Sequence, residues 1–127
     1  MNYPSEFRYT KEHEWVKLEG NRAKMGITDH AQAELGDIVF IELPTVGLEI
    51  KKGDNLATVE SVKAAGEVYA PISGKVIEVN TELESSPEII NSSPHNDGWI
   101  AVLEITDPSA ADDLLDVASY EQYLSAE

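Results

Sequence analysis

Short runs of β-branched and apolar residues recur along this chain of 127 residues, with turn signals between them every eight to twelve residues. This spacing predicts a mainly β fold, an antiparallel sandwich or flattened barrel with short peripheral helices. The length suits one domain with a single packed core. The expected strands are 7–9, 15–18, 23–27, 37–43, 55–60, 67–70, 75–79 and 99–105.

The expected helices are short and lie between or after the strands. Thr28 or Asp29 caps a helix over 30–35 that Gly36 ends. A single helical turn is expected over 86–90. The tail is predicted to be helical from 107 to 114 or 115, with a last turn through Leu124 that begins at the capping box Ser119-x-x-Gln122. Its apolar and aromatic side chains should hold it against the body: Leu114, Leu115, Tyr120, Tyr123 and Leu124.

The charge balance restricts the partners of the chain. Nine basic residues against 24 acidic ones give a net charge of −15. Such a surface repels nucleic acid and anionic lipid, so neither is an expected partner, and it suits basic surfaces of partner proteins. The absence of cysteine excludes disulfides and thiolate chemistry. The first residues show neither a signal-peptide core nor a transit-peptide pattern, and we expect a cytoplasmic protein.

The remaining residues do not form a recognisable catalytic motif. The three histidines, His13, His30 and His95, are not at metal-ligand spacing, so no metal site is expected. No phosphate-binding glycine loop is present, and the serines have no base nearby in the sequence. The pattern therefore favours a protein without catalytic activity of its own.

Lys63 is the residue that the surrounding pattern makes chemically interesting. The segment 59–69 reads as two strands joined by a turn of small residues, with Lys63 at the tip. Ala64, Ala65 and Gly66 leave space around it. A lysine in this position offers a primary amine for acylation on a flexible stem. The ordinary alternative is a surface lysine that serves only solubility.

Five segments, in this order along the chain, resemble the H proteins of the glycine cleavage system. They are Tyr9-Thr10-Lys11-Glu12-His13-Glu14-Trp15, Gly26-Ile27-Thr28-Asp29-His30-Ala31-Gln32, Leu35-Gly36-Asp37-Ile38-Val39-Phe40-Ile41-Glu42-Leu43-Pro44, Glu60-Ser61-Val62-Lys63-Ala64-Ala65 and Gly98-Trp99. The resemblance extends from about Phe7 to Leu124. It implies a lipoyl-domain-like hybrid barrel or sandwich, with lipoate in amide linkage to Lys63.

The resemblance also implies a shuttle function. A pyridoxal-phosphate-dependent glycine decarboxylase would load an aminomethyl group on the lipoyl arm. A tetrahydrofolate-dependent aminomethyltransferase would remove it, and dihydrolipoyl dehydrogenase would reoxidise the arm. A lipoylating enzyme, either a lipoate-protein ligase or a lipoyl or octanoyl transferase, would attach the cofactor.

Further residues acquire candidate roles from the same resemblance. Glu12, Glu14 and Glu67 match positions of a cleft that shelters the loaded arm, where a carboxylate can pair with the cargo amine. Glu60, Ser61, Val62 and Ala64 are candidates for recognition by the lipoylating enzyme or a partner. Two positions depart from the family pattern: Gly66 stands where Ser or Thr is frequent, and His95 where Tyr is frequent.

Other functions remain open from the sequence. A lipoyl or biotin carrier domain of another multienzyme system is the main alternative, although such domains are shorter and usually have different residues beside the lysine. An acidic binding module with an unmodified Lys63, or a small hydrolase built on His13, belongs to a different class. We expect one monomeric carrier domain over 1–127, with a core of about 7–106 and a helical tail of about 107–125.

Overall fold

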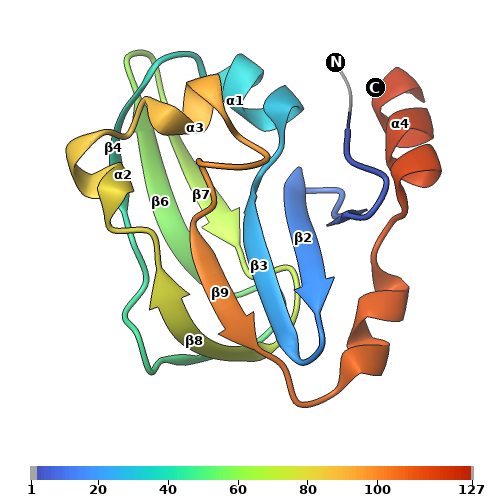
Figure 1. Ribbon diagram of the computed structural model, residues 1–127. Helices are drawn as coiled ribbons and strands as arrows, with labels where there is room; N and C mark the ends of the chain where they lie inside the picture. Colours follow the sequence, from blue (N-terminus) through green and yellow to red (C-terminus); the bar gives the residue numbers. More distant parts are fainter. Residues whose placement is uncertain (1–2, 127) are drawn as a thin grey trace.

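Two open antiparallel sheets form the body of the protein in the computed structural model, which describes residues 3–126 (Figure 1). The larger sheet has the strand order β1-β2-β3-β9-β8-β5 and the smaller one β4-β6-β7. This arrangement confirms the predicted mainly β fold. In chain order the strands are β1 Arg8–Tyr9, β2 Glu14–Glu19, β3 Arg22–Ile27, β4 Ile38–Glu42, β5 Glu49–Ile50, β6 Asn55–Ser61, β7 Ala65–Tyr69, β8 Gly74–Val79 and β9 Ala101–Glu104.

Short helices lie between or after the strands in the chain: α1 Asp29–Leu35, α2 Glu82–Ser85, α3 Ile89–Ser92, the 3₁₀ helix η1 Pro108–Asp113 and α4 Val117–Ala126. Thr28 caps α1 as predicted, because its hydroxyl accepts a hydrogen bond from the Ala31 N–H. Gly36 ends the helix at φ 82°, and its N–H donates to the Gln32 carbonyl. Among residues 3–126, no helix is long and apolar enough to cross a membrane.

Several predicted boundaries are wrong. Ser119 does not begin the last helix, because Asp116 accepts the Ser119 N–H at 2.8 Å and α4 starts at Val117. The turn expected over 86–90 is α3, three residues later, and the first part of the tail is the 3₁₀ helix η1. The second arm of the Lys63 hairpin is β7, which begins at Ala65 rather than Glu67. Two elements, β5 and α2, were not predicted because each is too short to show a period.

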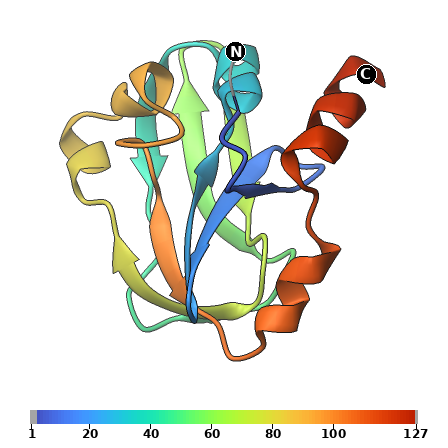
Figure 2. The same cartoon turned by 45° about the vertical axis from the view of Figure 1, so that its right-hand side comes forward.

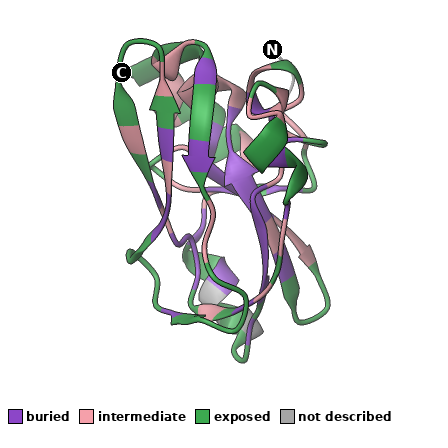
Figure 3. Cartoon of the chain, turned by 90° about the vertical axis from the view of Figure 1, so that its left-hand side faces the viewer, coloured by how far each residue is buried: buried purple, intermediate pink, exposed green. Residues whose placement is uncertain are grey.

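Both sheets contribute to one hydrophobic core. Val16 and Met25 of the larger sheet and Val59 and Val68 of the smaller one belong to the same buried cluster. Figure 3 shows buried and exposed residues on the same strands, as expected where one sheet face is covered and the other meets solvent. This core fixes β6 and β7, the two arms of the Lys63 hairpin.

A second, aromatic cluster attaches the C-terminal helix to the N-terminal segment (Figure 2). The Tyr120 ring is fully buried and stacks on that of Tyr9, with ring centroids 4.6 Å apart and planes 7° apart. Leu115 and Leu124 pack against this cluster, while Leu114 joins the main core. The predicted attachment of the tail is therefore confirmed. The division into core and tail as one domain stays a prediction.

Candidate functional site

Lys63 lies on the turn between β6 and β7, at the same end of the molecule as α1 (Figure 1). Ser61 holds this turn together. Its Oγ accepts hydrogen bonds from the Ala64 N–H at 3.0 Å and the Lys63 N–H at 3.3 Å, and its hydroxyl donates to the Ala64 carbonyl at 3.0 Å. The Ser61 N–H also donates to the Ala64 carbonyl, at 2.7 Å. One small side chain thus fixes the backbone on which Lys63 stands.

The turn is also attached to the rest of the protein. The Val62 N–H donates to the Asp37 carbonyl at 3.0 Å, which joins the turn to the residue before β4. The exposed Lys63 side chain lies along Gly36, where an added Cβ would stand 3.3 Å from Cε and 3.8 Å from Nζ. The hairpin predicted from the sequence is present, and Lys63 is at its tip.

An exposed apolar surface adjoins the turn. The β4–β6 pairing is irregular between Ile38 and Phe40, so that Val39 and Phe40 both point to solvent, 54% and 50% exposed. Val62, next to the lysine, is 68% exposed. We expected a regular strand over 37–43 and did not predict this surface. The unbroken apolar run Ile38-Val39-Phe40-Ile41 was a signal that alternation fails there.

The other residues proposed around Lys63 have different environments. Glu60 and Ala64 are exposed, and Glu60 lies opposite Phe40 in the register. Gly66 is not part of the tip but lies in β7 opposite Val59. A Cβ on Gly66 would stand 3.0 Å from a methyl carbon of Leu35, so this position lies under α1. The missing side chain at Gly66 therefore leaves space for Leu35 and not, as we expected, for Lys63.

A cavity of about 250 Å³ lies between α1, β7 and the loop before β2. Its lining includes all three carboxylates proposed from the sequence, Glu12, Glu14 and Glu67. Ile27, Ala31 and Leu35 are among its apolar walls. The structure thus brings residues from three segments of the chain into one cleft, which begins three residues beyond Lys63, at Gly66.

Glu14 differs from the other two cleft carboxylates because it is only 2% exposed. The Thr10 hydroxyl donates to its Oε1 at 2.6 Å, and the Tyr69 N–H donates to its Oε2 at 3.3 Å. Burial raises the pKa of Glu14 to about 7, and these two hydrogen bonds oppose that rise. This carboxyl therefore keeps its proton to a higher pH than a glutamate in solvent does. Glu12 and Glu67 are exposed, and Glu67 accepts a hydrogen bond from the Tyr69 hydroxyl at 3.1 Å.

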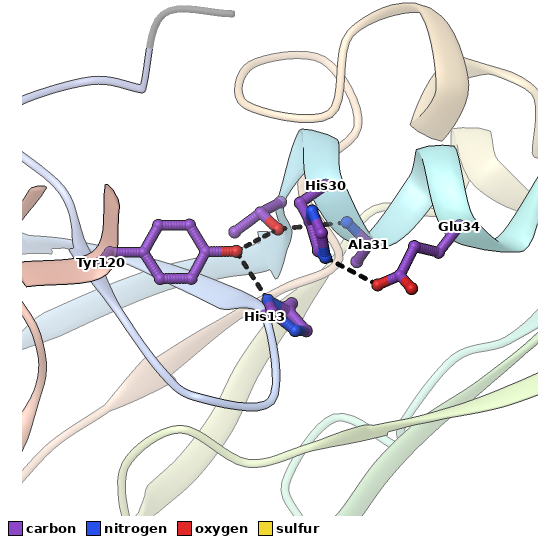
Figure 4. Close-up of polar contacts among 6 residues, drawn as sticks. His13, His30, Ala31, Glu34 and Tyr120 are labelled. Atoms are coloured by element: carbon purple, nitrogen blue, oxygen red, sulfur yellow. Dashed lines mark hydrogen bonds and ion pairs between the residues drawn. The ribbon is translucent and has the colours of Figure 1, made fainter. Parts of the chain in front are cut away.

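The histidines have positions that the sequence did not reveal. His95 accepts the Asp29 N–H at 3.0 Å on Nε2, which ties the loop before β9 to the start of α1. Burial lowers the pKa of His95. His13 and His30 meet at the edge of the cleft, with ring centroids 4.5 Å apart (Figure 4). Seventeen positions separate them in the chain, and for this reason no motif search connects them.

Comparisons with known proteins agree over nearly the whole chain. The family described as Glycine cleavage H-protein matches residues 7–127. The chain is 58% identical over 118 residues to a glycine cleavage system H protein of Coprothermobacter proteolyticus, covering 92% of this chain and 93% of that protein. It is 55% identical over 124 residues to the Staphylococcus haemolyticus protein of the same name, covering 98% of each. A crystal structure of a glycine cleavage system H protein from Mycobacterium marinum matches with a TM-score of 0.89 at 33% identity, covering 97% of this chain and 99% of that one.

Proposed function

The chain belongs to the glycine cleavage H-protein family, and we propose that it is the lipoyl carrier of a glycine cleavage system, with the lipoyl group in amide linkage to Nζ of Lys63. The observation that carries this proposal is the exposed Lys63 on a turn that Ser61 closes through its side chain. A modifying enzyme can reach such an amine, while the turn keeps it in one place.

The surroundings of Lys63 fit a lipoyl group. Val62, Val39 and Phe40 provide exposed apolar surface beside the amine. Gly66 lines the acidic cavity three residues further along the hairpin, a separation of at most roughly 10 Å even for extended backbone. An acyl group of several carbons, added to the lysine stem, extends the side chain over this separation. When bound, the lipoyl group would supply a disulfide whose S–S bond can open, so that one sulfur takes up the aminomethyl group and the other becomes a thiol.

We propose that the carboxylates of the cleft bind and protect that amine. They are Glu12, Glu14 and Glu67. A charge-assisted contact between ammonium and carboxylate is stronger where water is excluded. Glu14 is the most enclosed of the three, and a nearby cation favours its ionised form. The apolar walls at Ile27, Ala31 and Leu35 limit the access of water to the cargo.

The carrier function implies a set of enzyme partners. The proposed partners are a pyridoxal-phosphate-dependent glycine decarboxylase, an aminomethyltransferase, dihydrolipoyl dehydrogenase and a lipoylating enzyme. We propose that the chain itself catalyses none of these steps. Glu60, Ser61, Val62 and Ala64 are proposed as the residues that the lipoylating enzyme contacts, because they flank Lys63 in the sequence. A cytoplasmic location and a monomeric state stay predictions.

Intact mass spectrometry tests the attachment site directly. The purified chain, incubated with a lipoate-protein ligase, ATP and lipoic acid, should gain the mass of one lipoyl group. The Lys63→Arg variant should gain none, whereas the control Lys51→Arg, at another exposed lysine, should be modified like the wild type. If the Lys63→Arg variant gained a lipoyl group, or if the wild type gained none, the proposal would be wrong. A biotin adduct after incubation with a biotin ligase would indicate the alternative carrier class.

The cleft assignment has its own test. Lipoylated protein loaded by the decarboxylase should release formaldehyde and ammonia faster in Glu14→Gln than in the wild type. The matched control Glu84→Gln, at an exposed position on α2, should leave the lifetime of the loaded protein unchanged. An unchanged lifetime in Glu14→Gln would show that this carboxyl does not hold the amine.

A further inference from the structure

His13, His30 and Glu34 meet at the edge of the acidic cavity (Figure 4). His30 and Glu34 are one turn apart on α1, and His30 Nε2 lies 2.7 Å from Glu34 Oε1. His13 comes from the loop before β2, and its ring centroid is 4.5 Å from that of His30. One possible ligand atom from each residue lies within 4.8 Å of the other two. Two imidazoles and a carboxylate thus converge from two segments of the chain.

The orientation of His13 is fixed from outside the cluster. Its Nδ1 lies 2.9 Å from the hydroxyl of the buried Tyr120, and that hydroxyl lies 2.8 Å from Thr28 Oγ1. A histidine held through one ring nitrogen can present the other nitrogen as a ligand, which is the usual arrangement around protein-bound metals. The His13 backbone has φ 70°, a conformation that residues other than glycine seldom adopt. Tertiary contacts therefore hold this side chain in place.

The electrostatic environment favours a cation. The cavity beside the cluster has four carboxylates in its lining, Glu12, Glu14, Glu34 and Glu67. In the described part of the chain, no Lys or Arg lines this cavity. The chain as a whole carries a net charge of −15. A divalent ion at the cluster would reduce the repulsion among these groups.

We infer that His13, His30 and Glu34 form a binding site for one divalent transition-metal ion of the zinc class, with an open coordination position toward the cavity. Two histidines and a glutamate are a ligand set that zinc uses, and imidazole also suits cobalt, nickel and copper. Neighbouring ligands of a tetrahedral zinc are roughly 3.3 Å apart. The possible ligand atoms lie within 4.8 Å of one another, so side chains have to rotate to bring them to this spacing, and Glu34 is exposed enough to move.

Titration of the full-length chain with zinc alone tests this site. The protein should carry no polyhistidine tag, be left unlipoylated and be freed of metal with EDTA. Isothermal titration calorimetry should then show one Zn²⁺ bound per chain. Co²⁺ should produce visible absorption bands of an ion with nitrogen and oxygen ligands. Absence of binding at millimolar metal would overturn the inference.

Variants distinguish metal binding at the cluster from nonspecific metal binding to an acidic surface. Glu34→Gln and His30→Asn should each weaken Zn²⁺ binding at least about tenfold. Tyr120→Phe removes the hydroxyl beside His13 Nδ1 and should weaken binding by about tenfold, although it removes no ligand. Glu42→Gln removes an exposed acid from outside the cluster and should bind like the wild type.

The outcome stays decisive if one variant fails to fold. Circular dichroism identifies such a variant, and Glu34→Gln, on the exposed face of α1, then decides alone. Equal affinity of the wild type and a folded Glu34→Gln would show that the cluster is only an ion pair beside a ring contact. The measurement uses unlipoylated protein, so it is independent of whether Lys63 carries a lipoyl group.

Discussion

Burial makes Glu14 the residue with the most altered acidity in the cleft. Its pKa rises from 4.5 to about 7 on folding, so between these values the folded chain binds a proton that the unfolded chain releases. Stability therefore falls as pH rises through this window. Glu14→Gln should remove this part of the pH dependence, which amounts to at most about 3 kcal/mol. Urea unfolding of metal-free protein at pH 5 and pH 8 measures it.

Glu84, exposed on α2, provides the control for this prediction. Glu84→Gln should show the same change in unfolding free energy between pH 5 and pH 8 as the wild type. If Glu14→Gln also retains that change in full, then Glu14 is ionised in the folded protein at both pH values.

Ser61 determines how firmly the lysine is presented. Ser61→Ala deletes the oxygen that accepts two backbone N–H groups of the turn. The loss in stability should be at most about 1 kcal/mol, because solvent can replace these bonds. The rate of lipoylation should fall several-fold, since the turn no longer holds one conformation. Ser61→Thr keeps the hydroxyl and should retain most of the rate in the same assay. Equal rates for all three proteins would exclude this role.

At the scale of elements, the end of α1 and the hairpin turn meet at Gly36. This residue has φ 82° and ψ −158°, a conformation that is almost restricted to glycine. Gly36→Ala should cost about 2 kcal/mol of stability. Its Cβ would also stand 3.3 Å from Lys63 Cε, so that the lysine stem has to move. Urea unfolding and the rate of lipoylation measure the two effects.

Gly53 is the control position that separates the effect of backbone strain from the effect of contact with Lys63. It also has positive φ, 92°, but a Cβ there would meet no atom within 4 Å. Gly53→Ala should therefore lose stability yet be lipoylated at the wild-type rate. A wild-type rate of lipoylation in Gly36→Ala would mean that the position of the Lys63 side chain along Gly36 does not affect its modification.

At the scale of the whole molecule, the aromatic cluster joins the two ends of the chain to the cleft. Tyr120 stacks on Tyr9 and contacts His13 and Thr28 through its hydroxyl. Tyr120→Ala should cost about 4 kcal/mol, the usual effect of deleting a buried aromatic ring. The protein should still unfold in one step, because the tail and the body share this cluster.

Two probes distinguish one unfolding unit from two. Tryptophan fluorescence reports on Trp15 and Trp99, which belong to the aromatic cluster or pack against it, and far-ultraviolet circular dichroism reports on the whole backbone. Coincident urea transitions are expected for the wild type and for Tyr120→Ala. Separate transitions would show that the tail of about 107–125 is not part of the same domain.

The residues around Lys63 show how far local pattern extends. The helix cap at Thr28, the glycine at position 36 and the hairpin with Lys63 at its tip are local features, and all were predicted. Predictions from the local sequence pattern were wrong where tertiary contacts overrode local preferences. The irregular β4 pairing exposes both Val39 and Phe40, and Asp116 replaces Ser119 as the cap of α4. Gly66 was attributed to the tip, although its neighbour is Leu35 from another element.

The sequence by itself determined the mainly β fold, the hairpin and the lysine at its tip, because strand periods, turn residues and helix caps act over a few neighbouring positions. The cleft, in contrast, depends on the tertiary structure. Only the tertiary structure placed Glu14 inside it with a raised pKa, since burial depends on what covers a residue. Only the fold brought His13 to His30 and Glu34, because packing alone joins segments that lie far apart in the chain.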